Sequence, residues 1–422
     1  MIKAILKRAS GLLLTAVALA CWGTGAHGAI DGITGPTFNL TAKTGYISTA
    51  DGGSYLMWGY ANGNGQMQYP GPTLIVNQGD VVTVNLTNQL TVPVSIVFPG
   101  QSGVIATGGV AGLLTREAPA SGGTVSYTFT ASQPGTYTYY SGTRPELQIE
   151  MGLVGALIVR PTTNPTTQAY NHPDSQFDHE YLFLLSEMDP RIHEYVAAGR
   201  MDLVDNTTYF PVYWFINGRT APDTMAEANS PMLPHQPYNC MPMMHPGEKI
   251  LMRMIGGGRD PHPYHTHGNH HRVIAREGRL LSSAPGSGAD LGELAFTTTV
   301  IPGSTADAIF TWTGEKLGWD MYGHAPGDPL QPGEYAPDHG KPFPVVLPGV
   351  QELTFGQFYS GSPFLGAMGA LPPGEGGFNP NGGFLFMWHS HAEKEIVNND
   401  IFPGGMLTMM LIEHPSMMLM NP

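Results

Sequence analysis

The stretch PTLIVNQGDVVTVNLT (72–87) contains two runs of alternating apolar and polar residues on either side of a Gly-Asp turn. Alternation with a period of two predicts strands that bury one face. The segment PGEKILMRMI (246–255) repeats this phrase later in the chain. Two more pairs correspond in the same order, namely SIVFPG (95–100) with PYHTHG (263–268) and GTYTYYSG (135–142) with FLFMWHSH (384–391). Three matched segments in one order indicate an internal duplication.

The composition is typical of a turn-rich, all-β protein. The 422 residues include 55 glycines and 37 prolines, and only 12% are charged. The segment DPRIHEYVAAGRMD (189–202) alone has a persuasive helical pattern. We therefore predict two β-sandwich domains, at 30–165 and 170–422, joined by a polar linker. The second is larger because of a Gly/Pro-rich insertion at about 314–381, whose length is as typical of a lid, binding surface or oligomer contact as of a plain surface excursion.

The first 28 residues have the features of a secretory signal peptide, with three basic residues before a short apolar run and small residues after it. This favours export to the periplasm or the extracellular space over lipid anchoring at Cys21. Removal of the segment changes the formal net charge from -14 to -17, because it carries three positive charges and no negative ones. So acidic a chain is not expected to bind nucleic acid, and no other apolar run is long enough for a membrane span.

Histidines are concentrated in HPYHTHGNHH (262–271) and FMWHSHAEKE (386–395). Each segment contains an H-x-H pair, and residues two apart in a strand point to the same face. The four paired histidines are His265, His267, His389 and His391. On two adjacent strands they would suit one copper or zinc ion, while a relic cavity with hydrogen-bonded histidines is the alternative. His262 lies three residues before its pair and is expected to face elsewhere.

These segments resemble the copper-binding motifs of the multicopper oxidases. HPYHTHG (262–268) is similar to the H-P-x-H-x-H-G motif, and WHSHAEKEIVNNDIFPGGM (388–406) is similar to H-C-H-x3-H-x4-M. The likeness covers nearly all of residues 55–414, with both motifs in one domain as in the two-domain members. It implies two cupredoxin-like Greek-key sandwiches and assembly as a homo-oligomer, as in the trimers of that group.

The resemblance is incomplete at the positions that bind type 1 copper in the family. His262 matches the first histidine, but Ser390 stands in place of the cysteine and Glu395 in place of the third histidine. Met406 comes too late by spacing to match the methionine. A serine hydroxyl is a hard ligand that stays protonated, so it cannot replace a thiolate. No type 1 copper is therefore expected, and His262 ranks below the four paired histidines as a metal ligand.

The trinuclear copper cluster of the family takes four H-x-H pairs, two from each domain. The duplication places Val97 and Pro99 at one first-domain pair, and Tyr140 and Gly142 at the other. Only the second-domain half remains, which implies one or two copper ions in a type 2 or half-cluster site. Tyr140 would face this site if the domains stack as in the family.

Two hypotheses of function follow. The first is an exported copper-binding protein with a reduced histidine site, and any catalysis would be single-centre oxidation of a small molecule or metal ion, unlike that of a normal laccase. The second is a non-enzymatic protein that sequesters copper or serves in assembly on a cupredoxin scaffold. The sequence lacks the G-x-S-x-G, H-E-x-x-H, P-loop and dinucleotide motifs, so hydrolase, kinase and dehydrogenase functions have no support.

Weaker candidates surround these motifs. NCMPMMH (239–245) and the methionines at 417, 418 and 420 offer soft donors for Cu(I), although methionine more often fills irregular gaps in a core. His270 and His271 either reach the site or coat the far side of the strand. The acidic residues at 393, 395 and 400 suggest a hard-cation patch, with a solvated loop as the favoured alternative.

Overall fold

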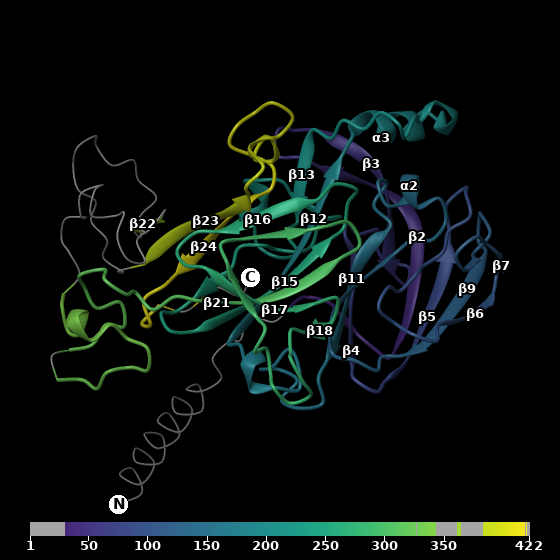
Figure 1. Ribbon diagram of the computed structural model, residues 1–422. Helices are drawn as coiled ribbons and strands as arrows, with labels where there is room; N and C mark the ends of the chain where they lie inside the picture. The colour runs from purple at the N-terminus through teal and green to yellow at the C-terminus, as the bar shows by residue number, and fades with distance from the viewer. Residues whose placement is uncertain (1–29, 326, 343–360, 364–382, 418, 420–422) are drawn as a thin grey trace, which may run out of the picture.

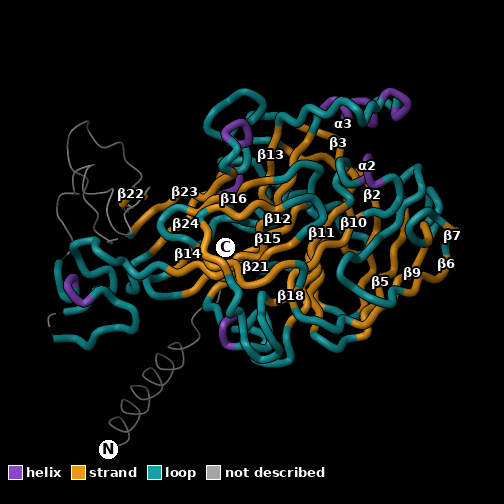
Figure 2. Tube along the Cα trace, in the orientation of Figure 1, coloured by secondary structure: helices purple, strands orange, loops and turns teal. Residues whose placement is uncertain are grey.

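The computed structural model describes residues 30–325, 327–342, 361–363, 383–417 and 419. The predicted signal peptide, Met418, Met420 and most of the predicted insertion beyond residue 342 lie outside these residues. Strands account for most of the regular structure (Figure 2), which confirms the all-β prediction. Every helix among the described residues is too short to serve as a membrane span.

The first half of the chain forms a sandwich of two sheets, on the right of Figure 1. One sheet has the order β1 (Ile33–Thr34), β4 (Gly71–Asn77), β11 (Val154–Arg160), β10 (Gly135–Tyr140). The other has the order β3 (Ser54–Asn62), β2 (Thr37–Ser48), β5 (Val81–Asn88), β9 (Thr124–Thr130), β6 (Ile105–Gly108), beside a small hairpin of β7 (Val110–Ala111) and β8 (Arg116–Glu117). In β5 every second side chain is buried, as the alternation predicts.

The second half forms another sandwich. Its larger sheet has the order β13 (Tyr213–Ile216), β12 (His179–Met188), β15 (Lys249–Gly256), β21 (Thr305–Thr311), β17 (His271–Arg276), β18 (Arg279–Leu280), with β19 (Glu293–Ala295) also pairing with β17. The other sheet has the order β14 (Met243–Met244), β24 (Leu407–Ile412), β23 (Phe384–Ser390), β16 (His262–Thr266), β20 (Thr297–Val300), with β22 (Gly361–Pro363) also pairing with β23. Aromatic side chains fill the core between the sheets, including Trp312, Trp388, Phe310 and Phe384.

Strand pairing recurs between the two sandwiches in the way that a duplication requires. β4 lies parallel to β11, and β14 lies parallel to β24. Likewise β2 lies parallel to β5, and β12 lies parallel to β15. The final antiparallel pair is β10 with β11 in the first sandwich and β23 with β24 in the second.

The two sandwiches are joined by polar and apolar contacts. Arg253 of β15 is fully buried and donates to Glu180 of β12, which also pairs with Arg160 of β11. Helix α3 (Pro190–Ala197) lies within the predicted helical segment and packs on β3, so Ile192 and Val196 complete the core of the first sandwich. The remaining described helices are single turns: α2 (Pro145–Gln148), η1 (Pro173–Ser175), η2 (Met201–Leu203), η3 (Asp223–Met225), η4 (Ala336–Asp338) and η7 (Glu393–Glu395).

Candidate metal centre

The two H-x-H pairs lie side by side in the centre of one sheet. β16 and β23 are antiparallel neighbours, and His265 stands directly opposite His389 in their register. Beyond the end of β23, the His391 N–H donates to the Pro263 carbonyl at 2.8 Å, which holds the second pair in line. Because side chains alternate along a strand, this register places the paired histidines on the face that points away from the core.

The imidazoles of these pairs converge. Nitrogen atoms of His265, His267 and His389 all lie within 4.8 Å of one another. The Nε2 atoms of His267 and His389 are 3.2 Å apart, and the His391 ring centroid is 4.6 Å from that of His265. The His391 side chain is 51% exposed, so the cluster opens at the molecular surface.

Hydrogen bonds fix the orientation of two of these rings. His389 Nδ1 donates to the Ser390 carbonyl at 2.6 Å, and since a carbonyl only accepts, the lone pair of the neutral ring lies on Nε2. His265 Nδ1 bonds the Thr297 hydroxyl at 2.7 Å, which leaves its Nε2 toward the cluster. A metal-binding histidine commonly has such a partner on its second ring nitrogen.

The electrostatics of the cluster favour the neutral form of two of its rings, His265 and His389. Burial, followed by the neighbouring histidines, lowers the pKa of His265 to about 4. Burial also lowers the pKa of His389. Neutral imidazole nitrogen is the form that binds metal, and copper and zinc both favour it. The donor set therefore fits a copper ion, with His265, His267 and His389 as the inner group and His391 at its open side.

His262 lies on the opposite face of β16 and belongs to a different group. It is fully buried, its Nδ1 is 2.9 Å from Glu395 Oε2, and its Nε2 is 2.8 Å from Glu187 Oε2. Burial disfavours the charged ring, but the hydrogen bonds and charges of the two carboxylates outweigh it and raise the pKa of His262 to about 9. His262 is thus an imidazolium held between two carboxylates, apart from the four paired histidines.

Hydrogen bonds extend this group in both directions. The Ser390 hydroxyl donates to Glu395 Oε2 at 2.6 Å. On the other side, the Tyr209 hydroxyl lies 3.0 Å from Glu187 and 2.8 Å from Glu150 of the first sandwich. A buried polar network therefore runs from β23 to the interface between the sandwiches. Glu187 and Tyr209 were not found from the sequence, because they lie far from the histidine motifs along the chain.

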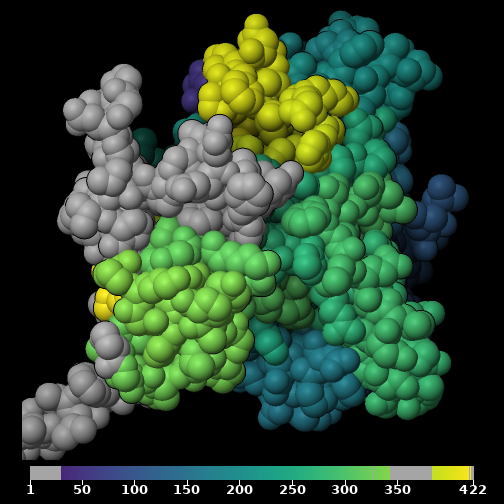
Figure 3. Space-filling model, turned by 60° about the vertical axis from the view of Figure 1, so that its left-hand side comes forward, coloured from purple at the N-terminus to yellow at the C-terminus, as the bar shows by residue number. Residues whose placement is uncertain are grey.

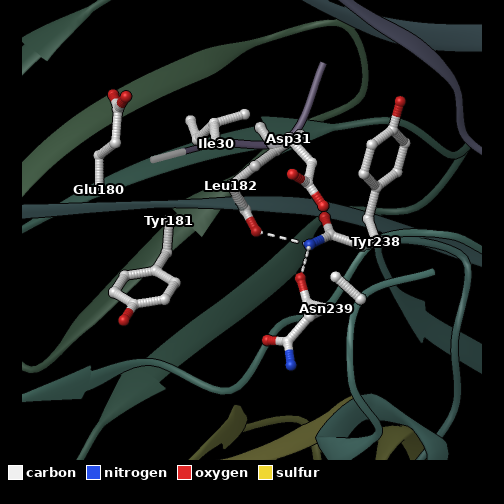
Figure 4. A pocket seen from close by; sticks show the side chains of 9 residues that line it. Ile30, Asp31, Glu180, Tyr181, Leu182, Tyr238 and Asn239 are labelled. Atoms are coloured by element: carbon white, nitrogen blue, oxygen red, sulfur yellow. Dashed lines mark hydrogen bonds between the residues drawn. The ribbon is translucent and has the colours of Figure 1, made fainter. Parts of the chain in front are cut away.

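The chain also has a small pocket elsewhere (Figure 4). Its volume is about 30 Å³, and it lies beside β12 among Asp31, Leu182 and Tyr238. Asn217 also lines it, and its side-chain amide donates to the carbonyls of Leu182 and Asn239. A space of this size holds about one water molecule, so we assign it no ligand.

Comparison with known proteins finds similarity to multicopper oxidases. Residues 43–164, in the first sandwich, match the multicopper oxidase family model. The chain is 37% identical to the multicopper oxidase MCE of Talaromyces pinophilus over 112 residues, and 26% identical to a probable nitrite reductase-hydroxylamine oxidoreductase fusion protein of Kuenenia stuttgartiensis over 251 residues. These matches cover 25% and 58% of this chain but only 18% and 25% of the relatives.

Solved multicopper oxidases share the fold of nearly the whole chain. The multicopper oxidase mgLAC aligns with a TM-score of 0.55 and 19% identity, over 91% of this chain and 88% of that one. A blue copper oxidase from Nitrosomonas europaea aligns with a TM-score of 0.54 and 21% identity, over 89% and 85%. The cupredoxin-like fold predicted from the resemblance is therefore confirmed.

The first sandwich has the same strand pairing at the equivalent position but different side chains. Val97 and Tyr140 exchange backbone hydrogen bonds of 2.8 and 3.3 Å, just as His265 and His389 face each other in the second sandwich. This register matches the alignment of the duplicated segments residue by residue. The counterpart of the histidine pair is thus a valine and a tyrosine, and the Tyr140 hydroxyl lies beside Gly303.

The backbone of Met406 lies beside this network, although its spacing does not match the family's methionine. The Ser390 N–H donates to its carbonyl at 3.0 Å, and its own N–H donates to the Glu395 carbonyl at 2.8 Å. The intervening residues leave the strand and return, so their number does not determine how far apart the ends lie. Serine, glutamate and histidine thus share a buried, hydrogen-bonded group at the positions that match the type 1 copper ligands.

The weaker candidate residues from the sequence lie in different places in the structure. Cys240 is buried, its thiol donates to the Thr224 carbonyl at 3.1 Å, and burial raises its pKa to about 12, as expected for core packing. His271 is also buried, with both ring nitrogens bonded to threonine hydroxyls. Glu393 is 75% exposed while Glu395 is buried, so these two carboxylates do not form a common patch.

Proposed function

We propose that this chain is an exported, copper-binding protein in which four histidines hold one or two copper ions without a type 1 centre. These ligands are His265, His267, His389 and His391. The convergence of two H-x-H pairs on neighbouring strands carries the proposal, because local sequence alone cannot bring both pairs to one face of one sheet. Export and assembly as a homotrimer rest on the signal-like leader and on the family resemblance.

The residues around the cluster prepare it for metal. Thr297 and the Ser390 carbonyl orient two rings, and the lowered pKa values leave the nitrogens unprotonated at neutral pH. Bound copper would supply one-electron redox chemistry at this position. The exposed edge at His391 gives a small molecule or metal ion direct access.

The group around His262 limits the chemistry that we propose. Ser390 offers no thiolate, and its hydroxyl is engaged with Glu395. The usual route by which electrons enter the family's copper cluster is therefore missing. Substrate and oxidant would meet at the same site, which supports single-centre oxidation and not the four-electron chemistry of a laccase.

Copper loading tests the proposal. We expect the wild-type protein to bind one or two copper ions with a type 2 electron paramagnetic resonance signal and no intense absorption near 600 nm. The variant His265→Ala/His389→Ala should lose that signal, whereas His270→Ala, a neighbouring histidine outside the cluster, should retain it. Equal copper binding by the double variant would refute the site, and a strong blue absorption would refute the absence of a type 1 centre.

Assays of the loaded protein then separate the two functional hypotheses. Oxidation of a phenol or of ferrous or cuprous ion, lost in the double variant, would support an oxidoreductase. Tight copper binding with no turnover would instead support the sequestering function.

A further inference from the structure

A second group of metal-binding side chains lies in the loop that follows β21, far along the chain from the histidine motifs. The described residues of this loop, 313–325 and 327–341, form a compact lobe at the left of Figure 1 and the light-green surface at the lower left of Figure 3. Four of its side chains converge: Asp320, His324, Glu334 and His339. We call them the loop cluster.

The distances within the loop cluster match those around a small metal ion. Asp320 Oδ2 lies 3.1 Å from His324 Nδ1 and 3.8 Å from His339 Nδ1. Glu334 Oε1 lies 3.3 Å and 2.8 Å from the same two nitrogens. A tetrahedral zinc ion with bonds of about 2.0 to 2.1 Å holds neighbouring ligand atoms about 3.3 Å apart. The four N···O distances therefore link the two imidazole nitrogens and the two carboxylate oxygens in an alternating ring, with sides close to this length.

Backbone groups of the same loop hold the ligands in place. Asp320 accepts hydrogen bonds from the N–H groups of Tyr322 and Gly340, at 2.8 and 2.7 Å. Glu334 Oε2 accepts from the Gln331 N–H at 2.8 Å, which leaves Oε1 for the cluster. Second contacts of this kind orient the ligands in built metal sites.

The proton positions require a positive charge at the centre. His339 Nε2 is 2.8 Å from the Asp328 carbonyl, and since a carbonyl only accepts, Nε2 carries the hydrogen. In a neutral ring, Nδ1 would then point a lone pair at Glu334 Oε1 across 2.8 Å. Two acceptors repel at that distance, so the contact needs either a second proton on the ring or a cation that both atoms bind.

Apart from the two imidazoles themselves, no described side chain supplies that charge. The carboxylates of Asp320 and Glu334 are only 1% and 4% exposed. Within the described part of the chain, neither pairs with a lysine or an arginine, and Lys341 pairs with Asp338 instead. Two carboxylates this deeply buried are costly unless a positive charge compensates them.

From this geometry we infer that the loop cluster is a divalent transition-metal site of the zinc type. Two imidazole nitrogens and two carboxylate oxygens that all lie within 4.8 Å of one another are a donor set that zinc accepts. All four ligands are protein groups, as in a structural site, and the bound ion ties residue 320 to residue 339 and so fixes the lobe. This inference does not depend on copper binding by the paired histidines.

The test uses zinc and cobalt on the full mature chain that already carries His265→Ala/His389→Ala, so that the paired histidines cannot contribute. This protein should bind one zinc ion per chain, and cobalt should give the intense visible absorption of four-coordinate Co²⁺. Adding His324→Ala/His339→Ala should lower zinc affinity by at least about 100-fold. Glu315→Gln, which removes an exposed carboxylate of the same loop, should leave affinity unchanged.

Limited proteolysis gives a second readout that needs no variant. Chelation of the metal from the wild-type chain should expose the 313–341 loop to cleavage, and added zinc should restore its protection. Protection that is unchanged by chelation, or equal zinc binding after loss of both loop histidines, would overturn the inference. Protons on the two imidazoles would then supply the charge.

Discussion

Replacement of Glu395 by glutamine should remove much of the pH dependence that His262 gives to folding stability. In the folded chain burial lowers the pKa of His262, but the bonds and charges of Glu187 and Glu395 raise it from 6.5 to about 9. A raised pKa means that the folded state binds the proton more tightly than the unfolded state. The charged ring therefore contributes about 3 kcal/mol, which is fully present below pH 6.5 and is lost as the pH rises through about 9.

Glutamine keeps the shape and can still accept from His262 and Ser390, but it removes one of the two negative charges. The pKa of His262 should then fall back toward 6.5, and the stability lost between about pH 6 and about pH 9.5 should shrink by roughly 1.5 kcal/mol, half of the total. Urea unfolding of the wild type and of Glu395→Gln at these two pH values measures the loss of stability in each protein. The remaining titrating groups are the same in both, so the difference reports on His262 and Glu395.

The matched control is Glu393→Gln, which removes an exposed carboxylate two residues away and should leave the wild-type pH dependence intact. The same pH dependence in wild type and Glu395→Gln would refute the reasoning. That result would mean that the two carboxylates do not keep the His262 ring protonated.

Two more predictions follow from the electrostatics. Because the pKa values of His265 and His389 are lowered, copper binding should persist at about pH 5, and equilibrium dialysis showing a midpoint near 6.5, the value for ordinary histidines, would contradict this. Arg253→Met should destabilise the chain by about 3–5 kcal/mol in thermal or urea unfolding, since it removes the buried partner of Glu180. Arg200→Met, at an exposed ion pair, should have little effect, and equal stability of the two variants would contradict the assignment.

Much of the fold could be predicted from the sequence because strand signals are local. The alternation in 72–87 and its repeat at 246–255 predict strands, and β5 and β15 form where these segments lie. The matched segments also placed Val97 and Tyr140 at the positions of His265 and His389, and in the structure Val97 pairs with Tyr140 as His265 pairs with His389.

The partners of His262 and the loop cluster could not be predicted from the sequence. These residues are distant from one another along the chain or lie in segments that have no hydrophobic periodicity. Glu187 is 75 residues from His262, and only the packing of β12 beside the second sheet brings them together. The backbone contacts of Met406 with Ser390 and Glu395 also could not be predicted from spacing, since the loop before Met406 returns to the strand. The loop cluster lies in irregular chain, where the positions of Asp320 and His339 depend on turns that no sequence pattern signals.

The sequence by itself determined that the protein is all-β, that imidazoles pair on one face of each histidine strand, and that no thiolate stands between His389 and His391. These features depend only on residue type and on the two-residue period of a strand. The tertiary structure decided which strands are neighbours, and therefore that the two pairs meet. It also decided the charges of these histidines. Burial and the neighbouring histidines lower the pKa of His265 to about 4, whereas two carboxylates outweigh burial and raise the pKa of His262 to about 9.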